Sequence, residues 1–205
     1  EAESGVREIE VGSFVPAKLL PQMADAFEII QYAKDIPNLT VVALVPNFIG
    51  AKNAIDAGAD KICLPLSVSE THSQANLRKS HDEVLEEIRK ISEYIEQLEK
   101  SQRPEFEGNL STAFGCTLEG KVSEDLVLKL GARMMELGCD EIGLSDTTGY
   151  ANPNQIKRLI RLLNKEVGQE NLKSMHLHNT RGLGLANALA SLEEGITTLD
   201  SSLGG

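Results

Sequence analysis

Gly138-Cys-Asp-Glu-Ile-Gly-Leu144 decides the fold, because a near copy of it occurs at Gly58-Ala-Asp-Lys-Ile-Cys-Leu64. Each stretch follows a predicted helix and opens a short apolar run. The glycine stands where a helix commonly ends in a left-handed residue, and the apolar run is typical of a strand covered on both faces. Gly5-Val-Arg-Glu-Ile-Glu-Val11 and Gly195-Ile-Thr-Thr-Leu-Asp-Ser201 repeat the arrangement. The repeating unit is therefore a helix, a glycine stop and a buried strand.

This pattern predicts seven strands, at residues 8–14, 40–46, 61–67, 107–113, 141–146, 173–178 and 197–202. Strands that alternate with helices pair in parallel. Seven such strands in a chain of this length favour a (β/α)8 TIM barrel over an open sheet. No Gly-x-Gly-x-x-Gly turn supports the open sheet. A complete barrel has about eight strands. We therefore expect one incomplete α/β TIM-barrel catalytic domain over residues 1–205, lacking the first strand and the C-terminal loop and helix.

Several helices are predicted between the strands from caps and apolar stripes. Residues 81–100 carry an inward stripe at Val84, Ile88, Ile91, Ile95 and Leu98. Ser123 is expected to cap one further helix, and Asn152-Pro153 to begin another. In the helix predicted for residues 183–194 we expect an inward stripe at Leu185, Leu189 and Leu192.

Composition narrows the class of protein. The 205 residues are 41% hydrophobic and 25% charged, which fits one domain with a substantial core. No run approaches the ~20 apolar residues that cross a bilayer, and no signal peptide opens the chain. With three widely spaced cysteines, as is typical of reduced thiols, we expect a cytoplasmic bacterial protein or a mitochondrial matrix protein. The net charge of -11 argues against a nucleic-acid partner.

His176-Leu-His178 carries the strongest functional signal. Alternate side chains of a strand share a face, so the two imidazoles are expected to project side by side at the strand end. Imidazole nitrogen binds divalent ions when further ligands converge on them. The other interpretation is a strand whose two histidines are hydrogen-bonded to carbonyls and water.

Two carboxylates also stand near predicted strand ends, where barrel enzymes keep their active sites. Glu10 lies between two apolar residues and is costly to bury unless paired, which indicates either a site residue or the partner of a buried arginine. Asp146 is either a site residue or the cap of the turn at residues 147–149. Cys116 is expected to be more exposed than the other cysteines. His72 and His81 are expected to be solvated surface residues or residues at the start of a helix.

Five segments together resemble 3-hydroxy-3-methylglutaryl-CoA lyase, a metal-dependent barrel enzyme, in the same order along essentially the whole chain. They are Glu10-Val-Gly-Ser-Phe-Val-Pro-Ala-Lys-Leu-Leu-Pro-Gln-Met23, Phe114-Gly-Cys-Thr-Leu-Glu-Gly-Lys121, Leu144-Ser-Asp-Thr-Thr-Gly149, His176-Leu-His-Asn-Thr-Arg-Gly182 and Asp200-Ser-Ser-Leu-Gly-Gly205. The first segment is specific to the lyases. The His-x-His segment is also similar to isopropylmalate and homocitrate synthases.

The resemblance implies cleavage of 3-hydroxy-3-methylglutaryl-CoA to acetoacetate and acetyl-CoA. It implies that His176 and His178 bind Mg²⁺ or Mn²⁺ and that His176, Glu10 and Asp146 are catalytic. The substrate-binding residues are expected to be Ser13, Lys18, Asn47 and Arg181. The family's remaining ligands, an aspartate and an asparagine, and its loop cysteine have no counterpart in these 205 residues. Asn179 stands where many lyases have aspartate.

Two other functions stay open. One is a Claisen-type condensing synthase or a metal-dependent aldolase that acts on a 2-oxo acid. The other is a noncatalytic acyl-CoA or metal-binding domain. In each enzymatic case the small-molecule partner is an acyl-CoA thioester or a related acid, no membrane is involved, and we expect a homodimer or a higher homo-oligomer.

Overall fold

The structure is a computed structural model that describes residues 2–202. Seven strands follow one another in the sheet in the order in which they occur along the chain. They are β1 (Glu8–Ser13), β2 (Thr40–Leu44), β3 (Lys61–Ser67), β4 (Glu105–Ser111), β5 (Glu141–Asp146), β6 (Leu172–Leu177) and β7 (Thr198–Leu199). The registers of β1 with β2, β2 with β3, β5 with β6 and β6 with β7 are all parallel, as the sequence predicts.

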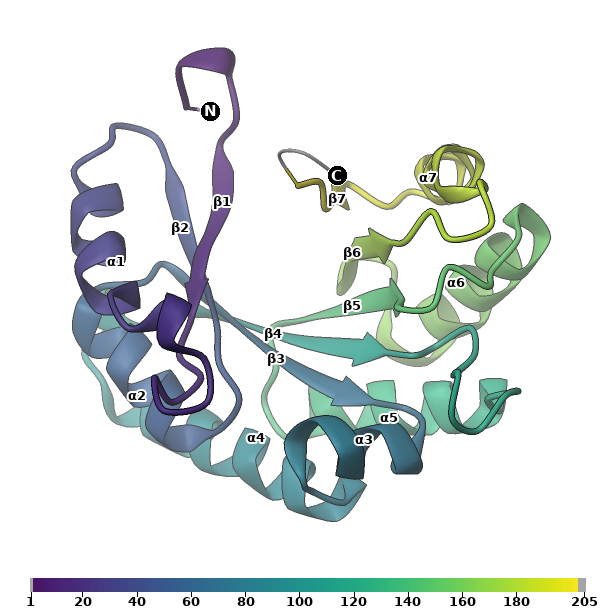
Figure 1. Cartoon of the computed structure of the whole chain (residues 1–205), viewed down its shortest axis with the longest axis horizontal. Coiled ribbons are helices and arrows are strands. Elements are labelled where there is room, and N and C mark those ends of the chain that lie inside the picture. Colours follow the sequence, from purple (N-terminus) through teal and green to yellow (C-terminus); the bar gives the residue numbers. More distant parts are fainter. Residues whose placement is uncertain (1, 203–205) are drawn as a thin grey trace. The chain divides into compact units, whose positions relative to one another are not determined.

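Helices connect these strands (Figure 1). They are α1 (Ala26–Lys34), α2 (Phe48–Ala57), α3 (Glu70–Leu77), α4 (His81–Gln97), α5 (Glu124–Glu136), α6 (Pro153–Val167) and α7 (Gly184–Glu193). Three short 3-10 helices are η1 (Ala2–Ser4), η2 (Pro21–Met23) and η3 (Lys100–Gln102). Within residues 2–202 no helix combines the length and the hydropathy needed to cross a membrane.

The chain divides into two compact units, which we describe separately. The first unit runs up to residue 65 and from residue 86 to 107, and the second from residue 66 to 85 and from 108 onward. In the first unit α1 packs on β1 and β2 and against α2 (Figure 1). Ile30, Val41 and Ala54 are fully buried there.

Helix α2 shows how local sequence sets the ends of an element. At its start the Asn47 side chain accepts a hydrogen bond from the Gly50 backbone N–H at 2.9 Å. At its end Gly58 has a φ of 99°, a left-handed conformation that a residue with a Cβ rarely adopts. Gly5, Gly138 and Gly195, the other three glycines of the repeat, also have positive φ. The predicted glycine stops are confirmed.

In the second unit α5, α6 and α7 pack on one another and on β5 and β6. Asn152 and Gln155 form a capping box at the start of α6, as the Asn-Pro pair indicates. Gly108 of β4 allows α5 to approach closely, because a Cβ at this position would lie 2.4 Å from the Met134 side chain and 3.0 Å from the Cys139 sulfur. Ser123 precedes α5, but its side chain makes no capping hydrogen bond, contrary to expectation.

The predicted inward face of α7 is wrong. Leu185, Leu189 and Leu192 are 87%, 60% and 50% exposed. The buried face instead carries Gly184, Asn187, Ala190 and Ser191. The Asn187 amide donates to the Ala151 carbonyl at 3.1 Å, and small residues let the helix approach its neighbours. The pattern of leucines alone therefore misplaced the contact face.

Strand ends were predicted less well than the existence of the strands. β3 and β5 agree with the predicted bounds, whereas β4 begins two residues earlier and β7 keeps only Thr198–Leu199 of the predicted 197–202. In α4 the predicted stripe is confirmed at Val84, Ile88 and Ile91, all of which are buried.

A buried ion pair lies in the first unit at the start of β3. The Lys61 side chain is 4% exposed, and its Nζ lies 2.9 Å from Glu107 Oε2 on β4. Glu8 Oε1 on β1 lies 3.3 Å from the same nitrogen. Removal of one partner leaves the other charge unpaired in a poorly solvated environment. Such pairs are therefore sensitive to substitution.

Lys61→Met should lower the free energy of unfolding by about 3 to 5 kcal/mol, because the Glu107 carboxylate stays buried without the Lys61 ammonium. Urea denaturation followed by circular dichroism measures the loss. Lys52→Met is the control, since the Lys52–Asp56 pair lies on the exposed face of α2 and should contribute far less. Equal losses in the two variants would contradict the structural role of Lys61.

Candidate metal centre

Two imidazoles converge at the end of β6 in the second unit. His176 Nε2 lies 3.2 Å from His178 Nε2, and the ring centroids are 5.0 Å apart. The side chain of His176 is 44% exposed, so the pair is open to solvent. Two ligands at neighbouring positions of an octahedral ion, each about 2.1 Å from it, are about 3 Å apart. The predicted side-by-side placement is confirmed, and the spacing fits chelation of one cation.

Asp200 is a residue of this centre that the sequence analysis did not assign. Its Oδ2 lies 3.0 Å from His176 Nδ1. A carboxylate at Nδ1 holds the proton there and leaves the lone pair on Nε2, which is the arrangement behind most metal-bound histidines. The register of β6 with β7, where Met175 pairs with Leu199, brings Asp200 beside His176. Only a strand register could have revealed this contact from sequence.

Within residues 2–202, no group of three or more His, Cys, Asp or Glu side chains is arranged to hold a metal ion. In this part of the chain the donors are therefore the two Nε2 atoms, with Asp200 behind one of them. Leu203, Gly204 and Gly205, which end the predicted family segment, lie outside the described residues.

Asp146 ends β5 and is completely buried. Its Oδ1 accepts the Tyr150 N–H at 3.0 Å and its Oδ2 accepts the Ala151 N–H at 3.1 Å, so it caps the turn as one of the two interpretations predicts. Burial raises the pKa of this carboxyl, while the two backbone N–H groups and the nearby His178 oppose the shift. The His178 N–H also donates to the Asp146 carbonyl at 3.4 Å, which ties the turn to β6.

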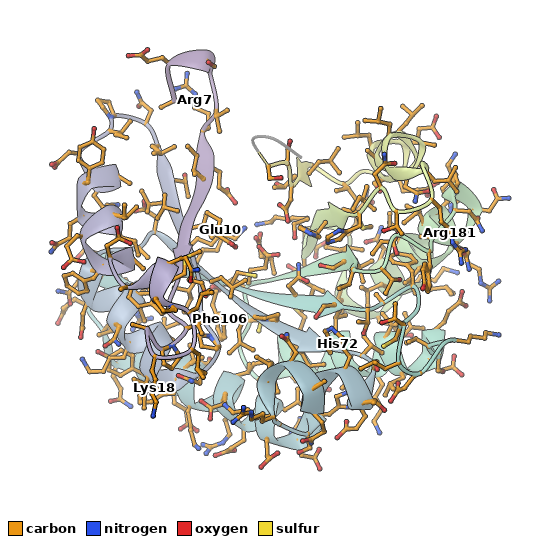
Figure 2. The ribbon with its side chains drawn as sticks, viewed as in Figure 1. Arg7, Glu10, Lys18, His72, Phe106 and Arg181 are labelled. Carbon is orange, nitrogen blue, oxygen red and sulfur yellow. The ribbon has the colours of Figure 1, made fainter. Side chains whose placement is uncertain are left out.

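Two of the four candidate residues of the first unit are exposed. Glu10 on β1 and Lys18 in the following loop are exposed (Figure 2), so the premise that Glu10 is a buried carboxylate is wrong. Ser13 lies at the end of β1, and its buried hydroxyl has no hydrogen-bond partner within residues 2–202. Asn47 already uses its side-chain oxygen to cap α2.

Arg181 follows β6 in the second unit and is exposed (Figure 2). Its guanidinium lies over the Tyr150 ring, 4.4 Å from the centroid. Stacking on an aromatic face orients the cation without neutralising its charge. Arg181 therefore keeps a cation beside the turn that Asp146 caps.

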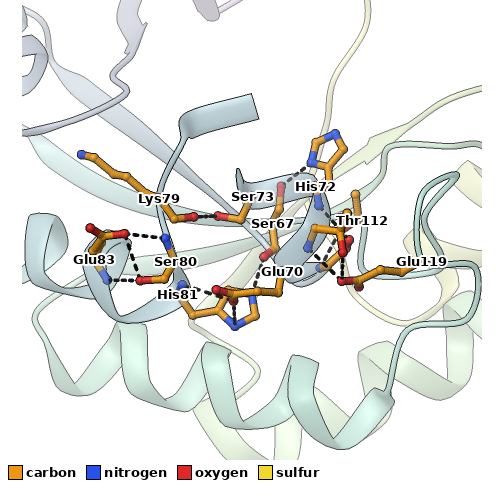
Figure 3. Close-up of polar contacts among 12 residues, drawn as sticks. Ser67, Glu70, His72, Ser73, Lys79, Ser80, His81, Glu83, Thr112 and Glu119 are labelled. Atoms are coloured by element: carbon orange, nitrogen blue, oxygen red, sulfur yellow. Dashed lines mark hydrogen bonds and ion pairs between the residues drawn. The ribbon is translucent and has the colours of Figure 1, made fainter. Parts of the chain in front are cut away.

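His81 begins α4, which confirms the helix-start alternative for this residue, whereas His72 lies within α3. Figure 3 shows both in a network at the end of β3. His72 Nδ1 lies 2.6 Å from Ser67 Oγ. His81 Nε2 lies 2.8 Å from the Ser67 carbonyl oxygen, and its Nδ1 lies 2.9 Å from Glu70 Oε2. The two histidines fasten α3 and the start of α4 to β3.

Cys116 is also placed differently from expectation. It is 1% exposed, and its backbone forms a two-way bridge with Gly120, with both N–H···O distances at 2.8 Å. Its sulfur accepts the Leu118 N–H at 3.3 Å. Cys63, Cys116 and Cys139 are all buried, and none of them forms a disulfide within residues 2–202.

Asp146→Ala should lower the free energy of unfolding by about 1 to 3 kcal/mol, because the N–H groups of Tyr150 and Ala151 lose their acceptors in a buried turn. Thermal and urea denaturation measure the change. Asp125→Ala, at an exposed position in the first turn of α5, is the matched control. A variant as stable as the control would show that water replaces the carboxylate.

Comparison with known proteins places the chain in a family. Residues 2–205 match the family described as HMGL-like. A hydroxymethylglutaryl-CoA lyase of Bacillus subtilis is 34% identical over 100% of this chain and 67% of its own length. A 3-hydroxy-3-isohexenylglutaryl-CoA/hydroxy-methylglutaryl-CoA lyase of Pseudomonas aeruginosa is 36% identical over 98% of this chain and 66% of its own length.

A solved structure supports the same assignment. The HMG-CoA lyase of Acinetobacter baumannii, in complex with coenzyme A and 3-methylmalate, is 40% identical, has a TM-score of 0.88, and is matched over 97% of this chain and 63% of that chain. The chain thus spans about two thirds of the length of these relatives. Matches to solved structures of HMG-CoA lyases confirm the predicted α/β TIM-barrel fold class. The chain belongs to the HMGL-like family.

Proposed function

We propose that the protein cleaves 3-hydroxy-3-methylglutaryl-CoA to acetoacetate and acetyl-CoA with the help of a divalent cation. The observation that carries the proposal is the 3.2 Å approach of the Nε2 atoms of His176 and His178 in a chain of the HMGL-like family. The names of the relatives, which are lyases of this thioester and of a longer analogue, support the choice of reaction.

The side chains fit a resident cation on their own chemistry. Two imidazole nitrogens face each other with one ring fixed by Asp200, and neutral imidazole is a good ligand for divalent transition ions. We assign His176 and His178 as the ligands and Asp200 as the residue that orients His176. When bound, Mn²⁺ or Mg²⁺ supplies positive charge that stabilises the developing oxyanion of the substrate.

The reaction breaks the C2–C3 bond of the acyl group. A base removes the proton of the C3 hydroxyl, which becomes the ketone of acetoacetate, and an acid returns a proton to C2 of the departing acetyl-CoA enolate. We assign His176 to the hydroxyl proton as a relay: its Nε2 would accept that proton when it does not ligate the cation, and the Asp200 carboxylate beside Nδ1 would stabilise the imidazolium that forms. Asp146 acts through the turn that it caps and through its backbone contact with His178.

Other assignments stay proposals. Glu10 is an exposed carboxylate on β1, and we assign it to the catalytic residues. We assign Ser13, Lys18, Asn47 and Arg181 to the substrate. In a chain with a net charge of -11, exposed cations such as Lys18 and Arg181 are the groups suited to an anionic thioester. A homodimer or higher homo-oligomer and a cytoplasmic or mitochondrial location also stay predictions.

His178→Ala should weaken Mn²⁺ binding by more than about 100-fold, because it removes one of two nitrogen ligands; Asp200→Asn should weaken it by about 10- to 100-fold. Electron paramagnetic resonance of free Mn²⁺ measures both affinities. The matched control is His72→Ala, which removes an imidazole bonded to Ser67 in the same unit. An unchanged affinity in His178→Ala would remove this residue from the ligands.

The reaction is tested by incubating the protein with Mn²⁺ and the thioester and measuring acetoacetate. We expect acetoacetate and acetyl-CoA in equal amounts, and none with His178→Ala. Parallel incubations contain the isohexenyl analogue, or acetyl-CoA with a 2-oxo acid. Release of free CoA thiol only in the last incubation would favour the condensing synthase, and Mn²⁺ binding without any reaction would favour a noncatalytic domain.

A further inference from the structure

A polar row crosses β4, β5 and β6 in the second unit and leads to the imidazole pair. Ser145 and His176 are register partners on β5 and β6, and register partners of a parallel sheet project from the same face. Ser145 Oγ donates to Asn109 Oδ1 on β4 at 2.6 Å. The three side chains of Asn109, Ser145 and His176 therefore share one face of the sheet.

The first two members of the row are polar side chains in a poorly exposed position. Asn109 and Ser145 are 8% and 6% exposed. Ser145 gives its only proton to the Asn109 oxygen, which fixes the plane of the carboxamide and makes its Nδ2 the remaining donor. Within residues 2–202 this Nδ2 makes no hydrogen bond. This Nδ2 is not among the fully buried unpartnered atoms, so an oriented donor on the face that carries His176 is accessible to an acceptor from outside the described chain.

The position of the donor limits what that acceptor is. Neighbouring strands are about 4.8 Å apart, so Asn109 and His176 stand on strands about 10 Å apart. A five-carbon acyl group with a hydrogen bond at its end covers such a distance. A carboxylate gains more from a neutral amide donor than an uncharged carbonyl does, because one partner is ionised. A neutral amide also adds no negative charge that would repel the carboxylate, which matters in an acidic chain.

We propose that Asn109, held by Ser145, is a specificity residue whose Nδ2 donates to the free carboxylate of the 3-hydroxy-3-alkylglutaryl thioester. This inference rests on the proposed function and names the part of the substrate that the row recognises. Ser145 is a positioning residue, since it acts through the Asn109 carboxamide.

Asn109→Asp tests the donor with little change of shape. Aspartate still accepts the Ser145 hydroxyl proton, but it places an anionic oxygen where Nδ2 was. We expect the KM of the thioester to rise by about tenfold or more, as loss of a hydrogen bond to a charged group implies. The kcat should change much less, because the contact exists before bond cleavage. Asn109→Ala should raise KM less, since it adds no repulsion.

Discrimination is the readout that a structural role would not move. The substrate is compared with 3-hydroxy-3-methylpentanoyl-CoA, in which a methyl group replaces the carboxylate, as a competitive inhibitor. The wild type should prefer the carboxylate, and Asn109→Ala should lose about tenfold of that preference. Its Mn²⁺ affinity should stay within about twofold. Asn154→Asp makes the same chemical change at an exposed position on α6 and should leave both quantities unchanged.

The outcomes separate the two proposals. A wild type that neither binds Mn²⁺ nor cleaves the thioester overturns the proposed function, and this inference with it. A wild type that does both, with unchanged KM and preference in the Asn109 variants, overturns only the inference. A parallel loss of Mn²⁺ affinity in Asn109→Ala also overturns it, because Asn109 would then support the metal centre instead of reading the carboxylate.

Discussion

The alternation of side chains along β6 is the constraint on which the rest of the candidate site depends. It places His176 and His178 on one face, with Leu177 between them on the other, and so allows the two Nε2 atoms to approach to 3.2 Å. Pairing with β7 adds Asp200 behind His176. A slip of one residue in that register would turn Asp200 to the opposite face. The centre is therefore specified by backbone pairing as much as by the identity of the histidines.

Much of the fold could be predicted because its strongest signals are local. A glycine with positive φ after a helix and an apolar run covered on both faces are properties of a few adjacent residues, and they located β3 and β5 correctly. The leucines of α7 show where such reasoning fails. Its contact face is chosen by close approach, which favours Gly184 and Ala190, and the leucines at 185, 189 and 192 remain outside. A helical pattern cannot tell which neighbour the helix meets.

The candidate site was predictable to the extent that it lies on one strand. The pairing of two imidazoles follows from period two, and the capping interpretation of Asp146 follows from the turn sequence after it. Contacts between distant segments did not follow, as with His81 and the Ser67 carbonyl. The burial expected of Glu10 failed because β1 stands at one end of the strand order, where only one neighbouring strand is paired with it in the described chain.

Gly108 gives the row beside the imidazoles its rigidity. Met134 and Cys139 leave no room for a side chain at Gly108, so β4 lies directly against α5. This close packing restricts movement of the backbone at the next residue. Asn109 thus starts from a fixed Cα, and its hydrogen bond to Ser145 restrains the remaining torsions. Ligand binding would otherwise cost conformational entropy to order this amide. Much of that entropy has already been lost during folding.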